Sequence, residues 1–183
     1  EIIQDKDYNF LRYNFFLSNY FLHKNNNLEA KKIITQSKND NDSNLLLKET
    51  KDFLLQNKSY KIKSFYNCQN PEDSIAEFFY VIANLYASEE DYQLSNFYLK
   101  ISLFLNDKFL PNKALLAENF YFQKKYKLSK KVYESIKSIG PTYSWYASKS
   151  ISTILLEEKG KEYSIKKLEK EFNSLTNPNF NHY

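Results

Sequence analysis

One pattern of large, small and aromatic residues occurs twice between Asn70 and Ile139, and Ala117 in the second copy lies 34 residues after Ala83 in the first. The first copy consists of Ile82, Ala83 and Tyr86, followed by Ser95, Leu99 and Ser102. The second consists of Leu116, Ala117 and Phe120, followed by Ser129, Tyr133 and Ile136. Recurrence at a fixed interval of roughly 20–50 residues is typical of folds that stack one structural unit on the next.

Each position has a mechanical reason in a pair of antiparallel helices. The large and the aromatic residue are four apart, so they lie on one face of the first helix. The small residue beside the large one lets the second helix approach closely, and the second helix contributes a small residue of its own. Short polar turns, ending in Tyr92 and Tyr126, join the two halves. We therefore predict two helical hairpins of the same design.

Weaker copies of the pattern precede and follow these two. The small residue of the first helix recurs at intervals of 32, 33, 34 and 35 residues, as Ser18, Thr50, Ala83, Ala117 and Ser152. We predict five helix pairs over approximately residues 8–40, 43–68, 71–107, 110–140 and 142–172, with a tail over 173–183. The second pair is the least regular, because Ile62 stands where a small residue is expected.

Capping residues support these boundaries. Asn70 and Pro71 suit a helix start, with Glu72 and Asp73 at the positive end of the helix dipole. Gly140 is expected to take the left-handed conformation after a helix, and Gly160 marks a turn. The chain has only two glycines and four prolines, so few residues interrupt its helices.

This order of residues at this interval resembles the tetratricopeptide repeat (TPR) family. The resemblance implies an all-α fold, a right-handed α-solenoid of about five antiparallel TPR-like helix pairs in a single domain over 1–183. Lys113 replaces the usual first aromatic residue of the fourth pair, and the usual glycine is Ala, Ser or Thr throughout. The interval is also close to that of other helical repeats, including pentatricopeptide repeats.

The resemblance implies a non-catalytic protein–protein interaction scaffold that binds a partner peptide or helix in a concave groove. The first helix of each pair, here called helix A, lines that groove. The principal groove candidates are Arg12, Phe15, Phe16, Asn19, Tyr80, Asn84, Glu118, Tyr121, Phe122 and Lys149. Their neighbours at related positions are His23, Glu77, Val81, Ser88, Leu115, Tyr146 and Thr153. The alternative is that these aromatic residues pack against the next helix A.

Some TPR proteins clamp a C-terminal carboxylate with Lys and Asn in this groove. Asn19 and Asn84 occupy the Asn position here, but Phe15 and Tyr80 stand where the clamping Lys belongs. The clamp is therefore not expected in this chain.

No catalytic set is visible in the sequence. Cys68 is the only cysteine, and the two histidines are His23 and His182. Glycine-rich phosphate loops are absent. We expect no enzymatic activity, no cofactor and no metal site.

Two other functions remain open at this point. One is RNA binding by a helical repeat, although acids and bases are interspersed and a net charge of +4 is small for phosphate binding. The other is a regulatory or targeting domain of a larger enzyme. The expected partner is another protein or peptide, a larger assembly is compatible, and no membrane span is expected. The start at Glu1 without Met suggests a trimmed segment, so the compartment stays open, with the cytoplasm preferred and the periplasm as the alternative.

Overall fold

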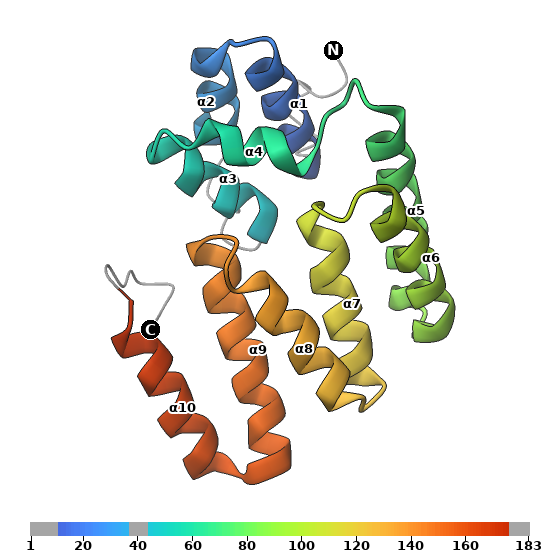
Figure 1. Ribbon diagram of the computed structural model, residues 1–183, viewed down its shortest axis with the longest axis vertical. Helices are drawn as coiled ribbons and strands as arrows, with labels where there is room; N and C mark the ends of the chain where they lie inside the picture. Colours follow the sequence, from blue (N-terminus) through green and yellow to red (C-terminus); the bar gives the residue numbers. More distant parts are fainter. Residues whose placement is uncertain (1–10, 37–43, 176–183) are drawn as a thin grey trace. The chain divides into compact units, whose positions relative to one another are not determined.

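The structure, a computed structural model, describes residues 11–36 and 44–175. These residues form ten α-helices and none of them lies in a β-strand, which confirms the all-α prediction (Figure 1). The helices are α1 (Leu11–His23), α2 (Asn27–Gln36), α3 (Leu45–Leu55), α4 (Ser59–Phe65), α5 (Pro71–Ser88), α6 (Tyr92–Leu105), α7 (Leu110–Phe122), α8 (Tyr126–Ile136), α9 (Pro141–Lys159) and α10 (Lys161–Asn173). The predicted tail beyond residue 175 lies outside the described residues.

The chain divides into two compact units, residues 1–112 and 113–183, and the division falls within α7. In unit 1, α1 packs against α2 and α3, and α5 packs against α6 (Figure 1). In unit 2, α9 packs against both α8 and α10. The prediction of one continuous domain over 1–183 stays a prediction.

A single left-handed residue reverses the chain between the two helices of each pair. These residues are Asn25, Asn57, Glu90, Lys124 and Gly160. Four of the five are not glycine, although left-handed backbone brings the Cβ close to the following carbonyl oxygen. Asn25 and Asn57 suit this conformation, because Asn tolerates it better than most residues, whereas Glu90 and Lys124 do not.

The first four turns are closed by the same pair of backbone hydrogen bonds. The amide after the left-handed residue donates to the carbonyl of the aromatic residue of helix A; the pairs are Asn26 to Phe21, Lys58 to Phe53, Asp91 to Tyr86 and Lys125 to Phe120. The left-handed residue itself donates to the next carbonyl along. This is a Schellman motif, which satisfies carbonyls that a helix end leaves open. The predicted aromatic position thus also anchors the turn.

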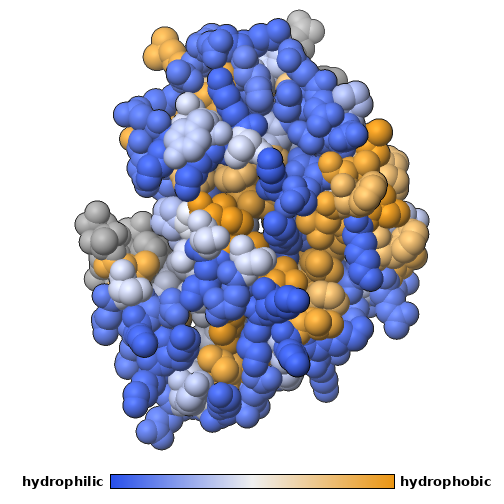
Figure 2. Space-filling view, viewed as in Figure 1, coloured by the Kyte–Doolittle hydropathy of each residue, from blue (hydrophilic) through white to orange (hydrophobic). Residues whose placement is uncertain are grey.

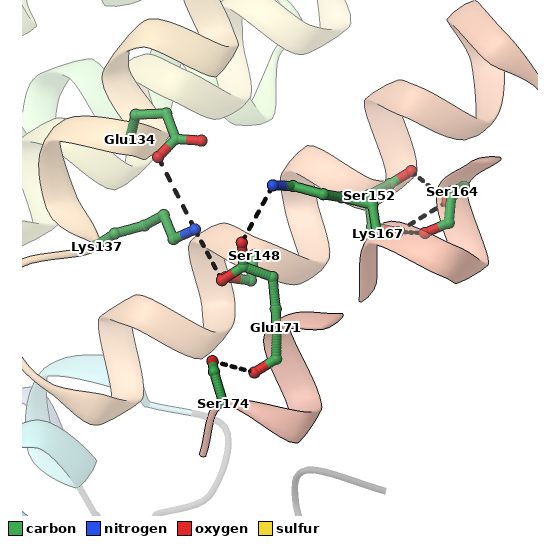
Figure 3. A network of polar contacts seen from close by, with 8 residues as sticks. All are labelled: Glu134, Lys137, Ser148, Ser152, Ser164, Lys167, Glu171 and Ser174. Atoms are coloured by element: carbon green, nitrogen blue, oxygen red, sulfur yellow. Dashed lines mark hydrogen bonds and ion pairs between the residues drawn. The ribbon is translucent and has the colours of Figure 1, made fainter. Parts of the chain in front are cut away.

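Small residues twelve apart meet inside the hairpins. The Ser18 hydroxyl donates to the Ala30 carbonyl at 3.1 Å, and the Ser129 hydroxyl donates to the Ala117 carbonyl at 2.8 Å. In the last pair Ser152 and Ser164 each donate to the other's carbonyl, as Figure 3 shows. All six residues are buried, so the hydroxyls replace water at carbonyls that two closely spaced helices enclose.

The second pair departs from this arrangement. Ile62 is fully buried in the small position, and the Thr50 hydroxyl donates to Leu46 of its own helix at 2.7 Å. The seven-residue helix α4 contacts α1 as well as α3. The Asn19 amide donates to the Ile62 carbonyl at 3.2 Å, which ties α1 to α4. The irregular sequence of this pair thus corresponds to an irregular position of its second helix.

The helix starts follow the capping prediction at Asn70 but not at Gly140. The Asn70 side chain accepts a hydrogen bond from the Glu72 amide, and α5 begins at Pro71. Gly140 was expected to be left-handed, but its φ of −174° is extended backbone and it lies at the start of α9. The prediction for Gly140 is wrong because α8 already ends at Ile136, so Gly140 precedes the next helix directly.

Enlarging a small position should force a hairpin apart. We expect Ala83→Leu and Ala117→Leu each to lower the free energy of unfolding by roughly 1–3 kcal/mol, because both side chains are fully buried against the second helix. Asn84→Leu, at the exposed neighbouring position, is the control. Thermal unfolding measures the effect, and unchanged melting temperatures for both variants would contradict the assigned packing.

Replacing Lys124 with glycine should increase the stability of the protein. At φ 58° a lysine is strained and glycine is not, so we expect Lys124→Gly to stabilise the protein by roughly 0.5–1 kcal/mol in urea unfolding. Lys125→Gly is the matched control, because Lys125 has a φ of −85°. Equal effects of the two substitutions would show that the turn conformation is not the cause.

Candidate functional site

The groove candidates fall into two groups, one in each compact unit. Unit 1 contains Arg12, Phe15, Phe16, Asn19, Tyr80 and Asn84, and unit 2 contains Glu118, Tyr121, Phe122 and Lys149. The two groups differ in exposure and are described separately.

In unit 1 the aromatic candidates are packed into a cluster of five rings. Phe15 and Phe16 of α1 meet Tyr66, which follows α4, and Phe109, which precedes α7. Ring centroids lie 4.8 Å apart for Phe16 and Tyr66 and 5.7 Å apart for Tyr66 and Phe109. Tyr80 of α5 completes the cluster at 6.1 Å from Phe109. These distances suit edge-to-face and tilted ring contacts, which stabilise a core.

Arg12 closes this cluster from one side. Its guanidinium lies 4.3 Å from the centre of the Tyr80 ring and 5.9 Å from that of Phe16. It also forms a 2.5 Å ion pair with Glu77 of α5, and both side chains are largely buried. Two helices of different pairs, α1 and α5, are thereby joined directly through positions that were expected to face a ligand.

Burial changes the acid strength of Glu77. Removal from water raises the pKa of the Glu77 carboxyl to about 7, and the Arg12 guanidinium offsets only part of this effect. The pair thus has the character of a buried structural contact, in which desolvation outweighs attraction.

The structure therefore favours the packing alternative for the α1 candidates. Phe15 and Asn19 are fully buried, so neither side chain is accessible to a partner in this structure. Phe16, Tyr80 and Arg12 are half-buried against one another. Asn84 is exposed on α5 and is the one candidate of unit 1 that faces solvent. The cause is the position of α4 and Phe109, which the spacing of helix-A residues does not reveal.

In unit 2 the candidates from α7 and α9 meet. The Tyr146 hydroxyl of α9 donates a hydrogen bond to the Glu118 carboxylate of α7, and its ring packs edge-on against Tyr133 at 5.7 Å. Burial raises the pKa of the Glu118 carboxyl. The pKa of the Tyr146 hydroxyl is also raised, mainly by burial and to a smaller extent by the nearby charge of Glu118. This polar pair joins the two helices directly.

A second polar contact lies one helical turn along α7. Tyr121 and Tyr126 both donate to Glu157 of α9, at 2.9 Å and 2.7 Å. The two hydroxyls lower the pKa of Glu157, and the bond to Glu157 raises the pKa of Tyr126 to about 12. The sequence reading missed Glu157. Its separation of 36 residues from Tyr121 is close to the repeat interval and could have indicated the pairing.

Two exposed side chains, one aromatic and one cationic, lie near these contacts. Phe122 is 57% exposed and its ring lies against Tyr121 at 5.5 Å, and Lys149 is exposed one turn after Tyr146. We call this surface the unit-2 face, formed by Glu118, Tyr121, Phe122, Tyr146 and Lys149. It combines an exposed aromatic side chain, a cation and a hydrogen-bonded polar pair.

A further polar network supports unit 2 without forming a site. Lys137, which directly follows α8, bonds to Glu171 of α10 at 2.9 Å, and Lys167 approaches the same carboxylate at 3.4 Å (Figure 3). The Ser148 hydroxyl donates to it from α9 at 3.3 Å. Burial opposes the charge of Glu171, but the two lysines hold the pKa of its carboxyl below the ordinary value. The network ties the last three helices together.

Residues 11–36 and 44–175 contain neither a candidate metal site nor a candidate membrane-spanning helix. No group of three or more His, Cys, Asp or Glu residues there could hold a metal ion. No helix in these ranges is long and apolar enough to cross a membrane. Comparison with known proteins gives no match: no protein family, curated protein or solved structure is significantly similar to this chain.

Glu77 should make stability depend on pH. The unfolded carboxyl loses its proton near pH 4.5 and the folded one near pH 7, so between these values the folded state holds more protons. Stability should therefore fall as the pH rises from 4.5 to 7, by roughly 2–3 kcal/mol from this group. Glu77→Gln should remove most of this decline in urea unfolding, whereas Glu162→Gln on the exposed start of α10 should not. Identical pH profiles for Glu77→Gln and the wild type would contradict the assignment.

Proposed function

We propose that this chain is a non-catalytic protein-binding domain of TPR-like helix pairs, which takes a peptide or short helix of a partner protein on the unit-2 face. The TPR-like pairing is supported by the recurring turn and by the small residues twelve apart, which occur at the predicted intervals. The right-handed solenoid that the resemblance implies is part of the proposal.

The observation that carries the binding proposal is that hydrogen-bonded side chains and exposed side chains lie next to one another on one face. Tyr121 and Tyr146 are each held by a carboxylate of the opposite helix, whereas Phe122 and Lys149 are exposed beside them. Side chains already fixed before binding lose little conformational entropy when a partner arrives. Phe122 offers an apolar anchor, and Lys149 offers a donor for a carboxylate or backbone carbonyl of the partner.

The candidates of unit 1 are not assigned to the proposed binding surface. Its aromatic candidates are enclosed in the five-ring cluster, so a partner could reach them only by unfolding contacts that stabilise α1 and α5. We therefore assign binding to α7 and α9 rather than to all helix-A positions.

The double variant Phe122→Ala with Lys149→Ala tests the unit-2 face. Both side chains are exposed, so the fold should be retained while partner capture from native lysate falls at least tenfold. The matched control is Leu128→Ala with Lys127→Ala, which removes an exposed apolar residue and an exposed lysine from α8.

Quantitative mass spectrometry of the captured proteins is the measurement. Proteins retained by the wild type and the control but lost from the double variant would support the proposal. Equal retention by all three proteins would contradict it. Retention of RNA alone, released by moderate salt, would point to nucleic-acid binding instead.

A further inference from the structure

The α5–α6 hairpin carries an apolar surface that nothing in unit 1 covers. On α5 the stripe consists of Ile75, Phe78, Ile82 and Leu85, and on α6 it consists of Leu94, Phe97, Ile101 and Phe104. Figure 2 shows it as the orange area over these two helices. We call the eight residues the α5–α6 face.

Both stripes have the spacing of a helix-packing seam. Within each helix the four residues follow one another at intervals of three, four and three. This is the a/d pattern by which one helix packs knobs-into-holes against another. Each helix of the pair thus presents a seam that its own hairpin partner does not occupy.

The exposure of this face is large. The exposed fractions are 46% for Ile75, 62% for Phe78, 61% for Leu85, 56% for Phe97 and 89% for Phe104. Together these five side chains leave roughly 600 Å² of apolar surface in water, taking about 150–250 Å² for a whole aromatic side chain. That reaches the upper end for the largest patch of a monomeric protein, roughly 300–600 Å². It also approaches the roughly 800 Å² that each partner contributes to a stable interface.

The face is also free of charge. From Ser74 to Ser88 the only charged residue is Glu77, which pairs with Arg12 outside the seam. From Tyr92 to Leu105 the only one is Lys100, which lies outside the i, i+3, i+7, i+10 stripe. A peptide bound here would find no charged or strongly polar group in the stripes to orient it. A second apolar surface of similar size would instead contact the α5–α6 face over its whole area.

A second copy of this chain supplies such a surface. Because α5 and α6 run antiparallel, Ile75 lies level with Phe104 and Leu85 lies level with Leu94, so the two stripes repeat each other in opposite directions. A two-fold axis lying in the face sets each seam of one copy against a seam of the other. We infer that the chain forms a two-fold symmetric dimer through the α5–α6 face, in which the four helices pack as an antiparallel bundle.

Sedimentation velocity of the 183-residue chain tests this inference. From about 1 to about 100 μM, the wild type should sediment with twice the 21.9 kDa mass of one chain. Phe104→Glu places a charge in the α6 seam at a side chain that is almost fully exposed, so the monomer should stay folded while the dimer weakens at least tenfold. Phe78→Glu should do the same from the α5 seam.

The matched control is Leu28→Glu, which places the same charge on an exposed leucine of α2. It should leave the dimer intact, and circular dichroism should show equal helix content in all variants. A monomeric wild type would overturn the inference and leave the face to a different helical protein. So would a dimer that survives both seam substitutions, or one that Leu28→Glu dissociates equally.

Discussion

In three of the helix pairs, small residues twelve positions apart meet between the two helices, which lets the helices approach closely. A buried hydroxyl then donates to the carbonyl that faces it, at Ser18, Ser129 and Ser152. The Schellman turns do not depend on this contact, because the second pair lacks it and the carbonyl of its aromatic residue still accepts the closing hydrogen bond. In the α5–α6 hairpin a different buried hydroxyl, that of Ser102, donates to the Ala76 carbonyl and fixes the register of the two seams.

Where this contact is missing, the arrangement changes. Ile62 fills the small position of the second pair, and α4 contacts α1 through Asn19. Tyr66 at its end then joins Phe15 and Phe16 in the ring cluster. The pair that carries Ile62 in its small position is thus also the pair whose second helix and following Tyr66 help to enclose Phe15 and Phe16.

The sequence predicts the local part of this structure well. Small and aromatic positions, the start of α5 and the turn at Gly160 are read from spacing and capping rules, because each depends on neighbours within about twelve residues. Phe15 and Asn19 show where this reasoning ends, since their burial depends on α4 and on Phe109, far along the chain. Glu90 and Lys124 show a second limit, because hydrogen bonds of the turn override the low preference of these residues for left-handed backbone. The partner-binding role of Phe122 and Lys149 remains a proposal from geometry.

The twelve-residue separation also has a kinetic meaning. A helix pair closed by contacts so near in sequence needs only a short loop to form, and loops of about ten residues close in roughly 10–100 ns. Topologies dominated by local contacts fold quickly, since little loop entropy is lost before the contacts form. A hairpin such as α1–α2 can therefore fold as a unit while the chain is still being synthesised, without waiting for more distant segments.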